Sequence, residues 1–205
     1  MPNECEFDTE KSQHILLLPG LIAPVRFLFP LVRYLRRSQK TYGVTAIPLR
    51  LSVTGFNSIV ERALKIITKS LLQKSSPKII ILFGHSHGGR VACELVRRLK
   101  KVSPTVEYTV VTSGSPMGKK LYYLPWPHRL LFNLSKAYRE WPYINQPDQN
   151  IVNRYIGYYS TDDRTVTPTF AKANFTGELI ELKQLTHHDL TSPDKIGPTL
   201  LGLLQ

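Results

Sequence analysis

A single serine lies between two histidines and two glycines in the stretch Gly84-His85-Ser86-His87-Gly88. A serine hydroxyl can attack a carbonyl carbon when a base removes its proton and N–H groups stabilise the resulting oxyanion. This G-x-S-x-G pattern follows the apolar run 78–83 and opens the amphipathic segment 90–101, which is the strand–turn–helix setting of a nucleophile elbow. The stretch therefore predicts a nucleophilic Ser86, with the backbone N–H of His87 as one oxyanion donor.

Candidates for the base, and for the acid that orients it, follow two later apolar runs. They are Asp162 and Asp163 after residues 153–160, and His187 and His188 after residues 177–185. The order Ser, then Asp, then His is the one expected after a nucleophile elbow. Because the carboxyl ends of parallel strands meet at one edge of a sheet, we expect both pairs to lie near Ser86. The spacing alone leaves open which member of each pair is used.

The elements that must position these residues follow from an alternation of apolar runs and amphipathic segments. This alternation predicts an α/β fold, with a mostly parallel sheet of about six strands and helices on both faces. Strands are expected at 14–20, 43–49, 78–84, 105–116, 153–160 and 177–185, and helices at 26–40, 57–73, 90–101 and 196–205. We expect one domain over residues 13–205, after a flexible N-terminus at residues 1–12.

Composition limits the other classes of function. The 205 residues carry a formal net charge of +12 and only two cysteines, so a disulfide framework is not expected. The basic residues are spread along the expected helices and no nucleic-acid-binding motif accompanies them, so no nucleic-acid partner is expected. No run approaches the ~20 apolar residues that span a membrane, and the acidic N-terminus is unlike a signal peptide. A cytoplasmic location is the expectation.

The segments LLLPGL, GHSHGG, TSGSP, DDRTV and HHDL together resemble the α/β-hydrolase superfamily, particularly small lipases and esterases. In that family the acid commonly stands three residues before a valine, which favours Asp163 over Asp162. The histidine commonly precedes an apolar residue by three positions, which favours His187 over His188. The family's second oxyanion N–H comes from the loop after the first strand of this chain, which implies Leu21.

The stretch from about 115 to 150 interrupts the alternation and combines aromatic residues with lysines and arginines. The resemblance implies that it forms a lid or substrate-binding cap with some helix. Its aromatic side chains would either complete the core or lie at a lipid–water boundary, with the cations near anionic head groups. The second interpretation predicts peripheral contact with an anionic membrane surface.

These residues predict a serine esterase or lipase that cleaves carboxylic esters of lipid-like or apolar acyl groups and needs no cofactor. The same residues could serve an acyltransferase or a thioesterase, and a catalytically silent fold that binds lipid or protein is the non-enzymatic alternative. A metal site is not expected, because Gly88 and Gly89 follow the pair His85 and His87 where further ligands would be needed.

Overall fold

The central sheet has six strands in the order β2-β1-β3-β4-β5-β6, and every neighbouring pair is parallel. The computed structural model describes residues 4–20, 23–38, 41–49, 55–72, 77–117, 150–173 and 175–203. The strands are β1 (Gln13–Leu18), β2 (Gly43–Ala46), β3 (Ile79–His85), β4 (Glu107–Ser113), β5 (Arg154–Tyr159) and β6 (Glu178–Glu181). The predicted α/β class and the strand number are confirmed.

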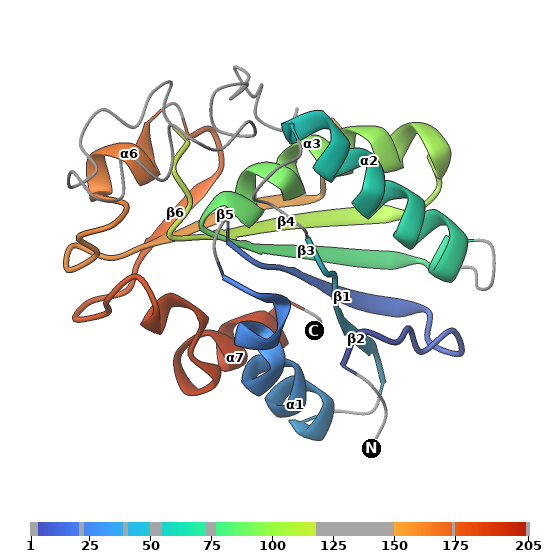
Figure 1. The fold of residues 1–205 in the computed structure, drawn as a ribbon, viewed down its shortest axis with the longest axis horizontal. Helices are drawn as coiled ribbons and strands as arrows, with labels where there is room; N and C mark the ends of the chain where they lie inside the picture. The colour runs from blue at the N-terminus through green and yellow to red at the C-terminus, as the bar shows by residue number, and fades with distance from the viewer. Residues whose placement is uncertain are drawn as a thin grey trace.

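Helices cover both faces of the sheet (Figure 1). Helices α2 (Phe56–Ile67) and α3 (His87–Val102) pack on one face, and α1 (Phe29–Ser38) and α7 (Pro193–Gly202) pack on the other. Shorter helical turns are at Val25–Leu28, Thr68–Leu72, Pro168–Lys172 (α6) and Asp189–Thr191. Helix α7 begins three residues before the predicted start, because Pro193 provides the fixed φ that suits the first turn of a helix.

Strand β3 explains why its sequence is a nearly unbroken apolar run. Ile80 and Leu82 belong to the core beneath α2 and α3, whereas Ile81 and Phe83 belong to the core beneath α1 and α7. All four side chains are fully buried. A strand that is covered on both faces needs apolar residues at every position rather than at alternate ones.

The order of the strands creates a topological switch point between β1 and β3. The chain runs from β1 to β2 and then returns past β1 to β3, so the connections after β1 and β3 lead to opposite faces. Ligands bind at such a switch point in open α/β sheets. Gly20 follows β1 and Ser86 follows β3, and Leu18 pairs with Gly84 at the ends of the two strands. The fold therefore brings the serine to the place where this architecture forms sites.

Two parts of the predicted domain organisation remain predictions. Residues 118–149, which make up most of the predicted cap, lie outside the described residues. In the N-terminal segment predicted to be flexible, the carbonyl of Glu4 accepts a hydrogen bond from the N–H of Ala46 at 3.0 Å. The carbonyl of Glu6 accepts one from the Thr45 hydroxyl at 2.9 Å. These bonds cover the outer side of the edge strand β2.

In the part of the chain that is described, no helix has the length and apolarity to cross a membrane.

Candidate active site

Ser86 occupies the sharp turn between β3 and α3. Its φ of 53° and ψ of −125° lie in a region that residues other than glycine rarely adopt. The turn is tight enough that a Cβ on Gly84 would lie 2.3 Å from the carbonyl oxygen of Gly88. A Cβ on Gly88 would lie 2.3 Å from the carbonyl oxygen of Leu18. Both glycines are therefore required by close contact, and the strained serine is held by its surroundings.

The Ser86 hydroxyl lies at the carboxyl edge of the sheet, next to the turn after β1. A Cβ built on Gly20 would lie 3.1 Å from the Cβ of Ser86 and 3.6 Å from its Oγ. The backbone N–H of Ser86 donates to the carbonyl of Ser113, at the end of β4, over 2.8 Å. Ser86 is partly exposed.

Of the two predicted oxyanion donors, His87 is among the described residues and Leu21 is not. His87 is the first residue of α3, and the N-terminus of a helix carries a partial positive charge from its unpaired N–H groups. Leu21 lies outside the described residues, although Gly20, the residue before it, contacts Ser86.

Asp163 and His187 are in direct contact. Oδ2 of Asp163 lies 2.7 Å from Nδ1 of His187. Oδ1 of the same carboxylate accepts the backbone N–H groups of Thr165 and Val166, each at 2.8 Å. The Asp163 side chain is completely buried, and that of His187 is 10% exposed. Three donors therefore hold the carboxylate, and the carboxylate orients the imidazole.

The alternates Asp162 and His188 do not take part in this contact. Asp162 is exposed, and its Oδ2 accepts the backbone N–H of Gln184 at 3.0 Å. His188 is exposed, and its ring packs edge-on against Phe27 with 5.4 Å between the ring centroids. One residue of each predicted pair thus lies in the buried contact, and its neighbour lies at the surface.

Three side chains at the ends of β3, β4 and β5, and Asp189 of the loop itself, hold the loop that carries His187. The bonds are Ser160 Oγ accepting from Leu185 N (3.3 Å), Asp189 Oδ2 accepting from Thr186 N (2.9 Å), His85 Nε2 to His187 O (2.9 Å) and Ser113 Oγ donating to Leu190 O (2.7 Å). Together with the bond from Gln184 to Asp162, they fix this loop on both sides of the imidazole.

Gly114 is a site residue to which the sequence assigned no role. Its φ is +55°, and an added Cβ would lie 3.2 Å from both Asp163 Oδ2 and His187 Nδ1. A side chain at this position would therefore crowd both groups of the Asp–His contact, and the positive φ also favours glycine. The available signal was a glycine directly after a strand, which indicates a turn, but only the tertiary contact shows what passes over it.

Burial keeps the two histidines beside Ser86 uncharged. It lowers the pKa of His85 to about 3, helped by the nearby His187, and lowers that of His87 to about 3, helped by Arg90. Neither ring is therefore suited to accept a proton near neutral pH.

Among the described residues, no group of three or more His, Cys, Asp or Glu side chains could hold a metal ion.

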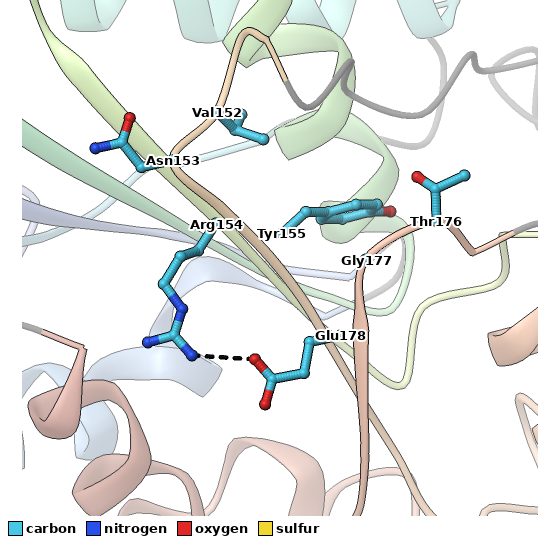
Figure 2. A pocket seen from close by; sticks show the side chains of 7 residues that line it. All are labelled: Val152, Asn153, Arg154, Tyr155, Thr176, Gly177 and Glu178. Carbon is cyan, nitrogen blue, oxygen red and sulfur yellow. Dashed lines mark hydrogen bonds and ion pairs between the residues drawn. The ribbon is translucent and has the colours of Figure 1, made fainter.

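A separate cavity of about 420 Å³ lies at the opposite edge of the sheet, where β5 and β6 begin (Figure 2). It is lined by Val152, Asn153, Arg154, Tyr155, Thr176, Gly177 and Glu178. The guanidinium of Arg154 pairs with the carboxylate of Glu178 at 3.0 Å. The cavity is remote from Ser86, because it lies at the amino ends of β5 and β6, whereas Ser86 follows the carboxyl end of β3.

Solved structures share this fold over nearly the whole chain. A lipase-esterase related protein from Clostridium acetobutylicum is 14% identical with a TM-score of 0.65, covering 98% of this chain and 97% of that one. The Bacillus licheniformis lipase BlEst2 is 14% identical with a TM-score of 0.66, covering 100% and 96%. The RedJ thioesterase of Streptomyces coelicolor is 16% identical with a TM-score of 0.64, covering 96% and 91%. No family model and no curated protein matches the sequence.

Proposed function

We propose that this chain, which has the α/β-hydrolase fold, is a serine hydrolase that cleaves carboxylic esters. The observation that carries the proposal is the 2.7 Å contact between Asp163 and His187 at the sheet edge where Ser86 is partly exposed. A carboxylate, an imidazole and a hydroxyl in this order form the arrangement that activates a serine.

In the proposed mechanism, Asp163 selects the tautomer of His187. The carboxylate accepts the Nδ1 proton, so the lone pair of the neutral ring is on Nε2. Nε2 takes the proton of Ser86 as Oγ forms a bond to the carbonyl carbon of the ester. The protonated His187 then donates that proton to the leaving alcohol as the C–O bond breaks. A water molecule, deprotonated by the same nitrogen, then attacks the acyl carbon. The proton returns from His187 to Ser86 Oγ as the Oγ–C bond breaks and the acid leaves.

The negative charge that forms on the carbonyl oxygen needs donors that are already in place. We assign the backbone N–H groups of His87 and Leu21 to this role. His87 is the first residue of α3, and its backbone N–H can donate to the oxyanion whatever its side chain does. Leu21 is assigned from its place after Gly20, which lies against Ser86. Such preorganised donors each contribute about 10²–10³ to the rate.

The proposed substrates are esters with lipid-like or apolar acyl groups. Support comes from the similarity to a lipase and to a lipase-esterase related protein. The similarity to a thioesterase favours acyl thioesters as a second candidate, because the same residues can attack either carbonyl. We also propose that the aromatic and basic residues of 115–150 contact the substrate or an anionic membrane surface, as the net charge of +12 favours.

A fluorophosphonate probe, which labels activated serines, tests the proposal with the wild-type protein and Ser86→Ala. We expect labelling of the wild type only, and a loss of at least about 10³ in the hydrolysis of p-nitrophenyl esters by the variant. The control is Ser103→Ala, at the far end of α3, which should behave as wild type. Acyl thioesters assayed alongside the esters distinguish the two substrate classes.

Labelling that persists in Ser86→Ala would contradict the assignment of the nucleophile. A wild-type protein that is neither labelled nor active on any ester or thioester would instead favour the catalytically silent fold.

A further inference from the structure

His85 connects the proposed nucleophile and the proposed base. It is the last residue of β3 and is 2% exposed. Its Nε2 lies 2.9 Å from the backbone carbonyl oxygen of His187, and the centroids of the two rings are 4.6 Å apart. His85 thus contacts both the backbone and the side chain of the residue 102 positions further along the chain.

The carbonyl partner determines the protonation of the His85 ring. A carbonyl oxygen can only accept, so Nε2 must carry a proton. Burial, which lowers the pKa of His85 to about 3, leaves the ring neutral near pH 7, with its lone pair on Nδ1. That nitrogen lies beside the turn after β1, since a Cβ on Gly20 would be 3.6 Å from it and 3.6 Å from Ser86 Oγ. His85 is therefore a constant donor and not a second base.

We infer that His85 is a positioning residue, whose Nε2–H and ring hold His187 at the distance from Ser86 that proton transfer requires. This inference rests on the proposed function, since it assigns His187 as the base. Asp163 anchors the imidazole through Nδ1, and His85 anchors the carbonyl of the same residue. The base is therefore held at both its side chain and its backbone.

The covalent link between His85 and Ser86 makes this positioning rigid. Ser86 is confined to one strained backbone conformation, and its N–H is bonded to Ser113. Two consecutive residues with little freedom therefore carry the hydroxyl and the bond that holds the backbone of His187. Because a misplacement of about 1 Å can cost about 10² in rate, loss of the His85 contact should lower kcat rather than substrate binding.

Two substitutions separate the hydrogen bond from the packing. His85→Phe keeps a ring but cannot donate, whereas His85→Gln keeps an N–H donor near the position of Nε2. We expect kcat for a p-nitrophenyl ester to fall about 10–100-fold in His85→Phe, with KM changed less than about threefold. His85→Gln should recover kcat to within about threefold of wild type. His85→Leu provides a second variant without a donor if the phenylalanine variant does not fold.

His14→Phe is the matched control for the loss of a buried histidine. His14 is also fully buried, and its Nε2 lies 2.7 Å from the carbonyl of Lys11. It is the second residue of β1 and pairs with Ile80 rather than with the end of β3. We expect its substitution to lower stability, measured by urea unfolding, without the specific loss of kcat.

A variant pair tests whether His85 acts through His187. In a His187→Ala background, His85→Phe should leave the residual rate unchanged, because the residue to be positioned is gone. The inference is overturned if the residual rate falls by the same factor as in the wild type, if His85→Phe keeps the wild-type kcat, or if His85→Gln loses as much as His85→Phe.

NMR of the histidine rings provides a reading that does not depend on turnover. The Nδ1 proton of His187, held between the ring and Asp163, should give a sharp downfield signal in wild type and His85→Gln. It should broaden in His85→Phe. A wild-type protein with this signal but no hydrolysis would refute the proposed function alone, and an unchanged signal in His85→Phe would refute the positioning role.

Discussion

Replacing Asp163 with asparagine changes one atom of the buried Asp–His contact. In the wild type, the N–H groups of Thr165 and Val166 each donate to Oδ1 over 2.8 Å. The amide oxygen of asparagine can still accept both. The amide NH₂ then takes the place of Oδ2, which faces Nδ1 of His187 at 2.7 Å. Because NH₂ can only donate, Nδ1 must present its lone pair and the ring proton moves to Nε2. That nitrogen is then unable to accept the proton of Ser86.

The expected loss of activity is much larger than the expected loss of stability. A wrong tautomer of this kind costs about 10⁴ in kcat, or about 5 kcal/mol at about 1.4 kcal/mol per factor of ten. The free energy of unfolding should fall by only about 1–3 kcal/mol, since all three contacts can persist but are made to a neutral amide instead of a carboxylate. Ester hydrolysis at saturating substrate and urea unfolding measure the two quantities on the same preparation.

Asp162→Asn is the matched control, because its amide oxygen can still accept the Gln184 N–H. We expect it to retain kcat within about threefold. A kcat for Asp163→Asn within about tenfold of wild type, or an equal loss in Asp162→Asn, would refute the assignment of Asp163.

Two further predictions concern Gly114 and the buried histidines. In Gly114→Ala, a Cβ 3.2 Å from both Asp163 Oδ2 and His187 Nδ1, on a residue with φ of +55°, should separate the two groups. We expect about 10–100-fold lower kcat and a loss of about 1–2 kcal/mol in unfolding free energy. His85 and His87, with folded-state pKa values of about 3, bind protons below about pH 6.5 only when the chain unfolds. Stability should therefore fall as pH falls from about 6.5 towards 3, by about 2–3 kcal/mol between about pH 7 and 5.5 for both together.

Gly202→Ala serves as the control for Gly114→Ala, because no atom of the described residues lies within 4 Å of the added Cβ. An unimpaired Gly114→Ala enzyme would show that the Asp–His contact tolerates a side chain beneath it. For the histidines, urea unfolding at the two pH values gives the comparison, and His85→Phe should show roughly half of the wild-type change. Equal unfolding free energies at both pH values would contradict the neutral, buried state of these rings.

Much of the fold could be predicted because its signals are local. The apolar run that became β3 reads as a strand buried on both faces, and Ile80 to Phe83 do alternate between two cores. The glycines around Ser86 indicated a tight turn, and contacts as short as 2.3 Å require them there. Periodicity was less informative for the short helix α6 (Pro168–Lys172), because five residues are too few to show a helical repeat.

For the candidate site, the sequence predicted the residue types and their place but not which residues are in contact. Chain order and strand ends placed two aspartates and two histidines near Ser86, but neighbouring residues on a loop point in different directions. Only the tertiary structure separates buried Asp163 and His187, 2.7 Å apart, from exposed Asp162 and His188. The space beneath them at Gly114 and the bond from His85 to His187 likewise join segments far apart in the chain. Local sequence determined which residue types reach this edge of the sheet, and packing between distant segments decided which of them touch.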